Sequence, residues 1–190
     1  MSQEINDASH WRDFDQNLLS HSMAHYLMAI DTLRTEHGYA RSTDVAEKLG
    51  VSRGAASMAL SQLKKKDWVG EDHNRFLLLT ETGAQIASQV EQNFLILNQF
   101  FKEVLNVGEE AAHADACKIE HLLGMETGKR LLWLMRFLMS DEELAIQVRK
   151  QMSKCNEGCS PVEVSECPIC GASGECLAAL GTPSIEGTKP

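Results

Sequence analysis

The feature that most limits how this chain can fold is a short helical segment, a glycine turn and a longer helical segment in immediate succession. Ser42 or Thr43 can cap the short helix, and Gly50-Val51 supplies the turn. Ser52 can cap the longer helix, which we expect to run to about Lys66. This order is typical of a helix-turn-helix. The residues that we expect these two helices to bury are Val45, Ala46 and Leu49, then Ala55, Ala56, Met58 or Ala59, and Leu63.

Two strand-like runs follow the second of these helices. They are Trp68-Val69-Gly70 and the run from Phe76 to Thr80, and residues 71–75 between them form the expected hairpin turn. A helix-turn-helix followed directly by a β-hairpin is a winged helix. Upstream, apolar residues at helical spacing predict a further helix from about Ser20 to His37, which Gly38 stops. We therefore expect a flexible N-terminus at residues 1–19 and a winged-helix DNA-binding domain at residues 20–83.

The next part of the chain is predicted to be entirely helical. A long helix, opened by Thr80 or Thr82, should cover residues 81–105, and helices over residues 109–123, 125–139 and about 140–154 should follow. Residues 125–139 are so apolar that they must be buried against something, and Ser140 with Glu143 has the pattern of a capping box. A long helix that leaves a winged helix commonly serves as a dimer scaffold. The predicted fold is thus mainly α with a small β wing, and residues 84–154 form a helical dimerisation and metal-binding domain.

Charge is unevenly distributed along the chain. The formal net charge is −9, yet residues 39–83 hold seven basic and six acidic side chains. An acidic body with one locally neutral-to-basic face suits a protein that meets double-stranded DNA through a small module, although a solvated lysine face would look the same. Arg53 is the residue at the start of the longer helix that can read guanine. The full set of predicted DNA-binding residues is Ser52, Arg53, Gly54, Ser57, Ser61, Lys64, Lys65 and Arg75.

A group of metal-ligating residues lies in the predicted helix over residues 109–123. Cys117, Glu120 and His121 stand at positions i, i+3 and i+4, and His113 is one turn earlier, so all four should project from one face. A thiolate, a carboxylate and an imidazole together suit a divalent transition ion such as Fe²⁺, Mn²⁺, Co²⁺ or Zn²⁺.

The winged-helix motifs and this ligand group occur together in one known family. Gly38-Tyr39-Ala40, the segment 44–49, the segment 79–83 and the Cys117-x-x-Glu120-His121 motif resemble the iron- and manganese-dependent repressors of the diphtheria-toxin-repressor family. The resemblance covers about residues 20–140. It implies a winged helix, a helical dimerisation domain, a homodimer on operator DNA, and Fe²⁺ or Mn²⁺ as co-repressor. Transferred by position, the implied metal ligands are His25, Cys117, Glu120 and His121.

The chain departs from that family at several ligand positions. His25 stands where iron-dependent members have methionine and manganese-dependent members have aspartate, so the family's metal preference does not transfer. Phe94 and Asn98 stand where the family's ancillary site has a histidine and a glutamate, which leaves His113 alone. The resemblance therefore implies one helical metal site and the loss of the second.

Five of the six cysteines lie in the C-terminal tail, predicted as residues 155–177. Four thiolates suffice for a [2Fe–2S] or [4Fe–4S] cluster or for a structural Zn²⁺, and the sequence favours the cluster. The run from Cys167 to Leu177 resembles the cysteine segment of ferrous-iron-transport protein C, a small winged-helix protein associated with an iron–sulfur cluster. We expect residues 178–190 to be disordered. The candidate cluster ligands are Cys155, Cys159, Cys167, Cys170 and Cys176, of which Cys155 is expected to be spare.

Together these features predict a cytoplasmic transcriptional repressor of iron homeostasis genes. It would act as a homodimer, and a divalent ion, an iron–sulfur cluster or both would set its affinity for DNA. The alternative is an accessory protein of iron transport that does not bind DNA and uses its winged helix for protein contacts. Enzymatic activity is not expected, because the sequence has neither a Ser-His-Asp order nor a glycine-rich phosphate loop. No apolar run is long enough to span a membrane.

Overall fold

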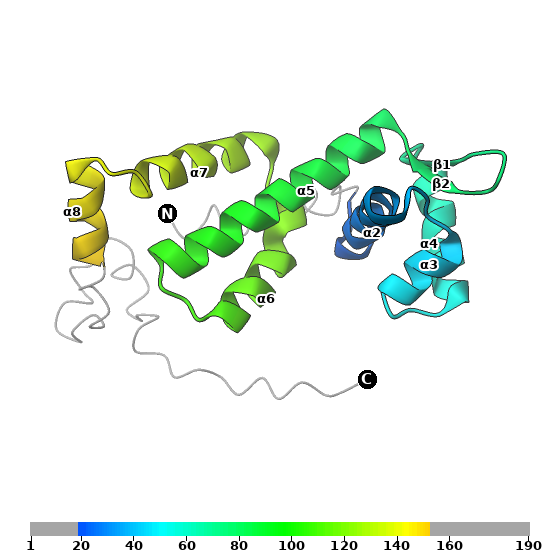
Figure 1. Ribbon diagram of the computed structural model, residues 1–190, viewed down its shortest axis with the longest axis horizontal. Coiled ribbons are helices and arrows are strands. Elements are labelled where there is room, and N and C mark those ends of the chain that lie inside the picture. The colour runs from blue at the N-terminus through cyan, green and yellow to red at the C-terminus, as the bar shows by residue number, and fades with distance from the viewer. Residues whose placement is uncertain (1–18, 153–190) are drawn as a thin grey trace, which may run out of the picture.

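A computed structural model of the chain describes residues 19–152. These residues form helices and one two-stranded antiparallel sheet, which confirms the predicted class, mainly α with a small β wing (Figure 1). The predicted flexible N-terminus, apart from Leu19, lies outside the described residues, as do the cysteine tail with its five candidate ligands and the C-terminal end. Among the described residues, no helix is long and apolar enough to cross a membrane.

The N-terminal half is the predicted winged helix. It consists of α2 (His21–His37), α3 (Ser42–Lys48), α4 (Arg53–Lys65) and the hairpin strands β1 (Val69–Glu71) and β2 (Leu77–Leu79). Val69 pairs with Leu79 and Glu71 with Leu77 in the antiparallel register. Gly38 ends α2 in the left-handed region with φ of 79°, a conformation that glycine adopts without strain. The predicted stop of this helix is therefore confirmed.

The helix-turn-helix differs from the prediction in two details. Arg41, not Ser42 or Thr43, precedes the first turn of α3, and its backbone N–H donates to the Asp44 carboxylate at 3.2 Å. In α4, Met58 is 67% exposed, whereas Leu60 is buried. The reason is the 3.6-residue period, which aligns Ala56, Leu60 and Leu63 on one face and turns Met58 to solvent. The predicted Ser52 cap is confirmed, since its hydroxyl accepts a hydrogen bond from the Ala55 N–H at 3.2 Å.

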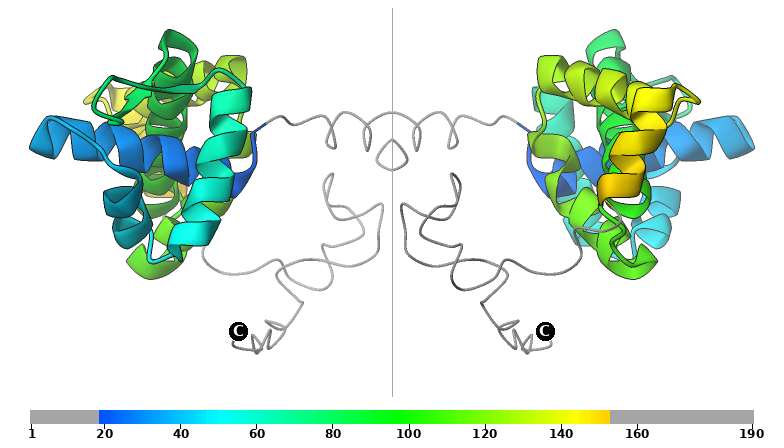
Figure 2. Two further views of the ribbon diagram at one scale, coloured as in Figure 1. Left: turned by 90° about the vertical axis from the view of Figure 1, so that its right-hand side faces the viewer. Right: turned by 90° about the vertical axis from the view of Figure 1, so that its left-hand side faces the viewer.

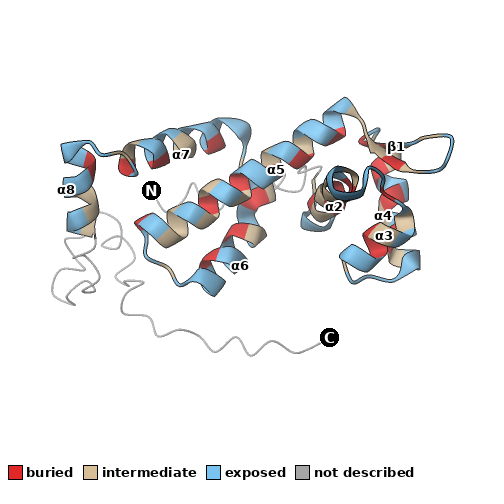
Figure 3. Ribbon diagram, in the orientation of Figure 1, coloured by how far each residue is buried: buried red, intermediate tan, exposed pale blue. Residues whose placement is uncertain are grey.

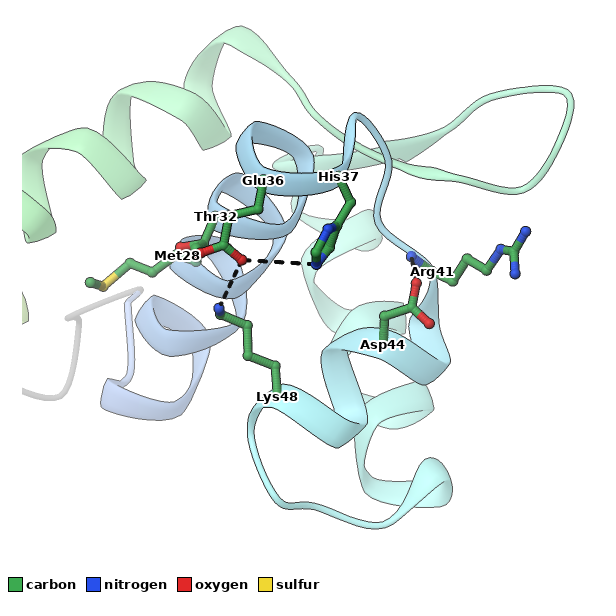
Figure 4. Close-up of polar contacts among 7 residues, drawn as sticks. All are labelled: Met28, Thr32, Glu36, His37, Arg41, Asp44 and Lys48. Atoms are coloured by element: carbon green, nitrogen blue, oxygen red, sulfur yellow. Dashed lines mark hydrogen bonds and ion pairs between the residues drawn. The ribbon is translucent and has the colours of Figure 1, made fainter.

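One hydrophobic core holds these elements together. Leu27 and Ile30 of α2, Leu63 of α4 and Leu77 of β2 are completely buried in it, and Figure 3 shows the buried faces of these helices turned toward one another. The end of α2 is also tied to α3 at the surface. The Glu36 carboxylate lies 3.5 Å from the Lys48 ammonium, beside His37 (Figure 4). Because α2 is fixed to the helix-turn-helix by core and surface contacts, a movement of α2 would carry α4 with it.

The long α5 (Glu81–Gln99) connects the two halves of the molecule (Figure 1). Thr80 caps it, as predicted, by accepting a hydrogen bond from the Gly83 N–H at 3.1 Å. The expected α-helix over residues 81–105 is interrupted, because Phe100–Val104 forms a turn of π-helix. After it come α6 (Glu109–Ile119), a 3₁₀ turn η2 (Glu120–Leu122), α7 (Met125–Leu138) and α8 (Glu143–Met152).

The last two helices lie at the far end of α5 from the wing, and α8 runs across the direction of α7 (Figures 1 and 2). The predicted capping box at Ser140 is wrong. The Ser140 hydroxyl donates to the Phe137 carbonyl at 2.7 Å and so closes the end of α7, while α8 begins only at Glu143. The prediction that residues 125–139 are buried holds for Met135 and Leu138, but Trp133 is 54% and Leu134 45% exposed.

Candidate metal centre and DNA-facing surface

Four metal-ligating side chains from distant parts of the sequence converge between α2 and the end of α6. One ligand atom from each of His21, His25, Cys117 and Glu120 lies within 4.8 Å of the corresponding atom of every other. The His25 Nε2 atom is 3.4 Å from the Cys117 Sγ atom and 3.8 Å from the Glu120 Oε1 atom. We call these four residues the α2–α6 cluster. It joins the winged helix to the C-terminal helices.

Local backbone geometry decides which side chains enter the cluster. His21 and His25 are four residues apart on α2 and therefore share one face. α6 ends at Ile119, and the chain tightens into the 3₁₀ turn at Glu120. A 3₁₀ helix advances about 120° per residue instead of about 100°, so the ligand spacing expected for a continuous α-helix changes at this point. Glu120 points inward, and His121 is displaced from it.

The structure thus brings together three of the four predicted ligands. His25, Cys117 and Glu120 belong to the cluster, whereas His121 lies beside it with its ring centroid 5.2 Å from that of His21. The sequence interpretation missed His21, whose ring centroid is 4.3 Å from that of His25. The signal was present as the spacing His21-x3-His25, because two histidines at i and i+4 on a helix can hold one ion.

Burial leaves polar atoms in the cluster and beside it without a protein partner. Glu120 is only 1% exposed, and neither its Oε1 atom nor the His121 Nδ1 atom has a hydrogen-bond partner. Desolvation raises the pKa of Glu120 to about 7. The same cause raises the pKa of Cys117, with the Glu120 charge adding to it, and lowers the pKa values of His25 and His121, to which neighbouring histidines also contribute. A buried acidic oxygen beside neutral imidazoles and a thiol is a set of donors that a divalent cation would satisfy.

A buried asparagine fastens the Glu120 turn to α5. The Asn93 side chain is 3% exposed, and its amide donates to the carbonyl of Glu120 at 2.9 Å and to that of Leu123 at 2.8 Å. Gln89 donates to the same Leu123 carbonyl at 3.3 Å. A Cβ atom at Gly128 would lie 2.6 Å from the Asn93 side-chain oxygen, so glycine permits this close approach of α7. These contacts fix the position of the backbone that carries Glu120.

His113 lies outside the α2–α6 cluster. It is exposed on α6, and the Phe94 ring packs against it edge-on at a centroid distance of 5.0 Å. His113 is one helical turn before Cys117 on α6, as predicted, but its side chain meets Phe94 of α5 and is not part of the four-residue group.

The predicted DNA-facing residues lie on one accessible surface of the winged helix. Arg53, Gly54, Ser57, Ser61 and Lys65 are exposed on α4, and Ser52 is exposed at its start, where its hydroxyl also serves as the helix cap. Arg75 is exposed in the wing with φ of 62°. Lys64 is half-buried and forms an ion pair with Glu71 of β1, so its charge is partly satisfied within the chain.

Comparison with protein families matches nearly all of the described residues. Residues 18–77 match the N-terminal DNA-binding domain of the iron-dependent repressors, and residues 80–144 match the metal-binding and dimerisation domain of the same proteins. The chain is 32% identical to the HTH-type transcriptional regulator MntR of Bacillus pumilus over 136 residues, which cover 72% of this chain and 93% of that protein. It is 31% identical to MntR of Geobacillus thermodenitrificans over 136 residues, which cover 72% of this chain and 95% of that protein.

Solved structures show the same fold. The manganese regulator SloR superimposes with a TM-score of 0.54 at 26% identity, over 60% of this chain and 53% of that one. The metal-dependent transcriptional regulator MtsR gives a TM-score of 0.55 at 22% identity and supports the fold alone, over 60% of this chain and 54% of that one. The match thus spans about half the length of both structures. The family models and the MntR relatives together show that this chain belongs to the iron-dependent repressors, a family of metal-dependent DNA-binding transcriptional regulators.

Proposed function

We propose that this chain is a cytoplasmic repressor of transition-metal homeostasis genes, above all of iron genes, whose DNA binding is switched on by a divalent ion such as Fe²⁺ or Mn²⁺ in the α2–α6 cluster. The observation that carries the proposal is the position of the cluster. Two of its residues stand on α2, which belongs to the winged helix, and two stand on α6 and η2, which belong to the C-terminal helices. In domain terms, residues 20–83 read DNA and residues 84–154 bind metal and dimerise.

The residues of the cluster would fix the angle between the two halves of the molecule. A bound divalent ion supplies positive charge that neutralises the Cys117 thiolate and the Glu120 carboxylate and accepts lone pairs from the imidazoles. His25 orients α2 toward η2, and Asn93 holds the Glu120 backbone in place. Because α2 packs on α4 through the common core, ordering of α2 sets the position of the DNA-facing helix. In a homodimer this would fix the spacing of two such helices on an operator.

The test of the DNA-binding proposal is the variant Arg53→Ala. Arg53 is exposed at the first turn of α4, where a recognition helix contacts base edges. Loss of a bidentate guanine contact costs about 1–3 kcal/mol, so we expect roughly 10- to 100-fold weaker operator binding and relaxed base preference. The measurement is fluorescence anisotropy with a metal-loaded protein and an operator selected from random duplexes.

The control variant is Lys102→Ala, which removes a basic side chain that pairs with Glu109 just beyond the end of α5, away from α4 and from the proposed dimer surface. It should leave the affinity unchanged. Operator affinity that is equal for Arg53→Ala and the wild type would contradict the role of Arg53. Absence of any selected duplex would contradict DNA binding by this chain.

We further propose that the exposed apolar residues of α7 contribute to the dimer surface. Met125, Trp133 and Leu134 are between 45% and 54% exposed, although they are large and apolar. The double variant Trp133→Glu/Leu134→Glu should give a monomer with an unchanged helical circular-dichroism spectrum, because a buried charge opposes association. Light scattering after size exclusion measures the mass. Met58→Glu, which changes an exposed residue of α4, is the control and should remain a dimer. If the double variant is still a dimer, Trp133 and Leu134 are not in the dimer interface.

For the cysteine tail, we propose an iron–sulfur cluster held by four of Cys155, Cys159, Cys167, Cys170 and Cys176, with structural Zn²⁺ as the alternative. The support is the number and spacing of thiols, which match polythiolate sites. Protein purified without oxygen should absorb at about 400 nm, contain iron and sulfide in comparable amounts, and lose the absorption in air. A colourless protein with one tightly bound zinc would instead make the tail structural and leave metal sensing to the α2–α6 cluster.

A further inference from the structure

The α2–α6 cluster has a donor set that differs from the one implied by the family resemblance, because His21 takes part in it. His21 stands in the first turn of α2, four residues before His25, and is exposed to solvent. Its ligand atom lies within 4.8 Å of those of His25, Cys117 and Glu120. His121, the residue that the motif would supply, is outside this group of four. The cluster therefore offers two imidazoles, one thiolate and one carboxylate.

Two of the donor distances within the cluster fit one small ion. Bonds of about 2.0–2.3 Å place two ligands of a tetrahedral ion about 3.3–3.8 Å apart. The two distances between His25 Nε2 and the Cys117 and Glu120 donor atoms, 3.4 Å and 3.8 Å, lie at the two ends of that range. A second observation points to a cation independently of this geometry. The Glu120 Oε1 atom faces the cluster from a side chain that is 1% exposed, and it has no hydrogen-bond partner.

The chemistry of the donors also limits which ion can bind. Sites rich in carboxylate, carbonyl and water oxygens suit Mn²⁺ and favour six ligands, whereas imidazole and thiolate suit Zn²⁺ and Fe²⁺. Here the only carboxylate of the four-residue group is that of Glu120, and the thiolate is a soft ligand. The compact set of four donors leaves Mn²⁺ without the oxygen ligands that it prefers.

We propose that His21 is the fourth ligand of a four-coordinate, thiolate-containing site, which takes a borderline ion of the Zn²⁺/Fe²⁺ class and binds Mn²⁺ only weakly. This inference rests on the proposed metal-switched function and specifies its ion. His121 then stays outside the coordination sphere, next to the His21 ring. The chain would then respond to a metal other than manganese, the metal for which the similar regulator SloR is named.

The experiment uses Co²⁺ as a spectroscopic probe of the full-length apoprotein, with the five tail cysteines changed to serine in a parallel sample so that only Cys117 can give a thiolate signal. We expect a sulfur-to-cobalt charge-transfer band, intense visible d–d bands of a tetrahedral ion, and displacement by Zn²⁺ but not by equimolar Mn²⁺. His21→Ala should weaken Co²⁺ binding by at least about tenfold and reduce the d–d intensity, since water replaces an imidazole. His113→Ala, an exposed histidine of α6 outside the cluster, is the matched control and should change neither signal.

Each other outcome has a definite meaning. If His121→Ala weakens Co²⁺ binding and His21→Ala does not, then His121 is the ligand and the inference is overturned, while the proposed function stands. The same holds if Mn²⁺ displaces Co²⁺, or if the spectrum has the weak bands of a six-coordinate ion. If the protein with serine in the tail binds neither Co²⁺ nor Mn²⁺, the cluster is not a metal site, and the proposed metal switch at α2 fails with it.

Discussion

Glu120→Gln is expected to abolish metal-stimulated operator binding and, at the same time, to make the apoprotein more stable above neutral pH. The carboxylate would be an anionic ligand of the cluster, beside the Cys117 thiolate. Its loss should weaken metal binding by about 100-fold or more, since changing even residues that only support metal ligands lowers metal affinity by about 10- to 100-fold. Without metal, the same carboxylate is a buried acid with no hydrogen-bond partner at Oε1. Its removal should therefore stabilise the fold.

The pKa of Glu120 determines how the stability of the apoprotein changes with pH. The pKa of Glu120 is raised from 4.5 to about 7 in the folded protein. The folded state thus holds its proton more tightly than the unfolded state, so the stabilising effect is complete below about pH 4.5 and is lost as the pH rises to about 7. Above about pH 7, the buried ionised carboxylate lowers the free energy of unfolding by on the order of 3 kcal/mol. Glutamine avoids this loss, although its own amide must still be buried.

The measurement is thermal unfolding in a chelator at about pH 5 and about pH 8. Glu120→Gln should melt close to the wild type at the lower pH and several degrees higher at the upper pH. Glu110→Gln, which changes an exposed acid in the first turn of α6, is the control and should melt at the same temperature as the wild type at both pH values. A difference between Glu120→Gln and wild type that is the same at both pH values would contradict the burial of an ionisable Glu120.

Gly83→Ala is expected to have the largest effect on the stability of the winged helix. A Cβ atom at Gly83 would lie 2.0 Å from the carbonyl oxygen of Trp68 and 2.9 Å from its carbonyl carbon. Both are backbone atoms, which cannot rotate away as the end of a side chain can. The Trp68 carbonyl also accepts the Thr80 N–H at 3.1 Å, so a shift of either chain would break the junction of wing and α5. We expect a loss of about 3 kcal/mol or more in the free energy of unfolding.

A loss of this size corresponds to a fall on the order of 10 °C in the melting temperature for a domain of this length. Gly124→Ala is the matched control, because Gly124 also lies at the N-terminal end of a helix, has φ of −67°, and would have no neighbouring atom within 4 Å of an added Cβ. It should melt within a few degrees of the wild type. If Gly83→Ala has the same melting temperature as Gly124→Ala, the close packing of α5 against the Trp68 backbone does not exist in solution.

The local sequence specified most of the winged helix. Ser52 and Thr80 cap the helices that they were expected to cap, Gly38 ends α2, and the two apolar runs after α4 pair as a hairpin. Each of these features depends on residues within a few positions of one another, so pattern and capping chemistry suffice to predict them. The cap of α3 was mispredicted because several polar residues lie at its start, and of the two alternatives Met58 and Ala59 only Ala59 packs against the core.

The metal site shows where such reasoning stops. The Cys117-x-x-Glu120-His121 motif singled out these three residues by type and spacing, and the family resemblance added His25 by position. Which imidazole completes the set depends on the 3₁₀ turn at Glu120 and on the way that α2 lies across α6, and these are properties of the packed molecule. His25 and Cys117 are 92 positions apart in the sequence, and no local pattern signals their contact.

The sequence by itself therefore determined the class of the protein: a winged helix, a set of helices behind it and a group of potential ligands. Helix periodicity, caps and turns act over a few residues and can be read from the sequence. The tertiary structure alone decided that His21 enters the cluster, that His121 stands aside, that Asn93 holds the Glu120 turn, and that the face of α7 remains uncovered. The reason is that contacts between distant segments depend on how whole helices pack, and a shift of about 20° per residue in one short turn is enough to redirect a side chain.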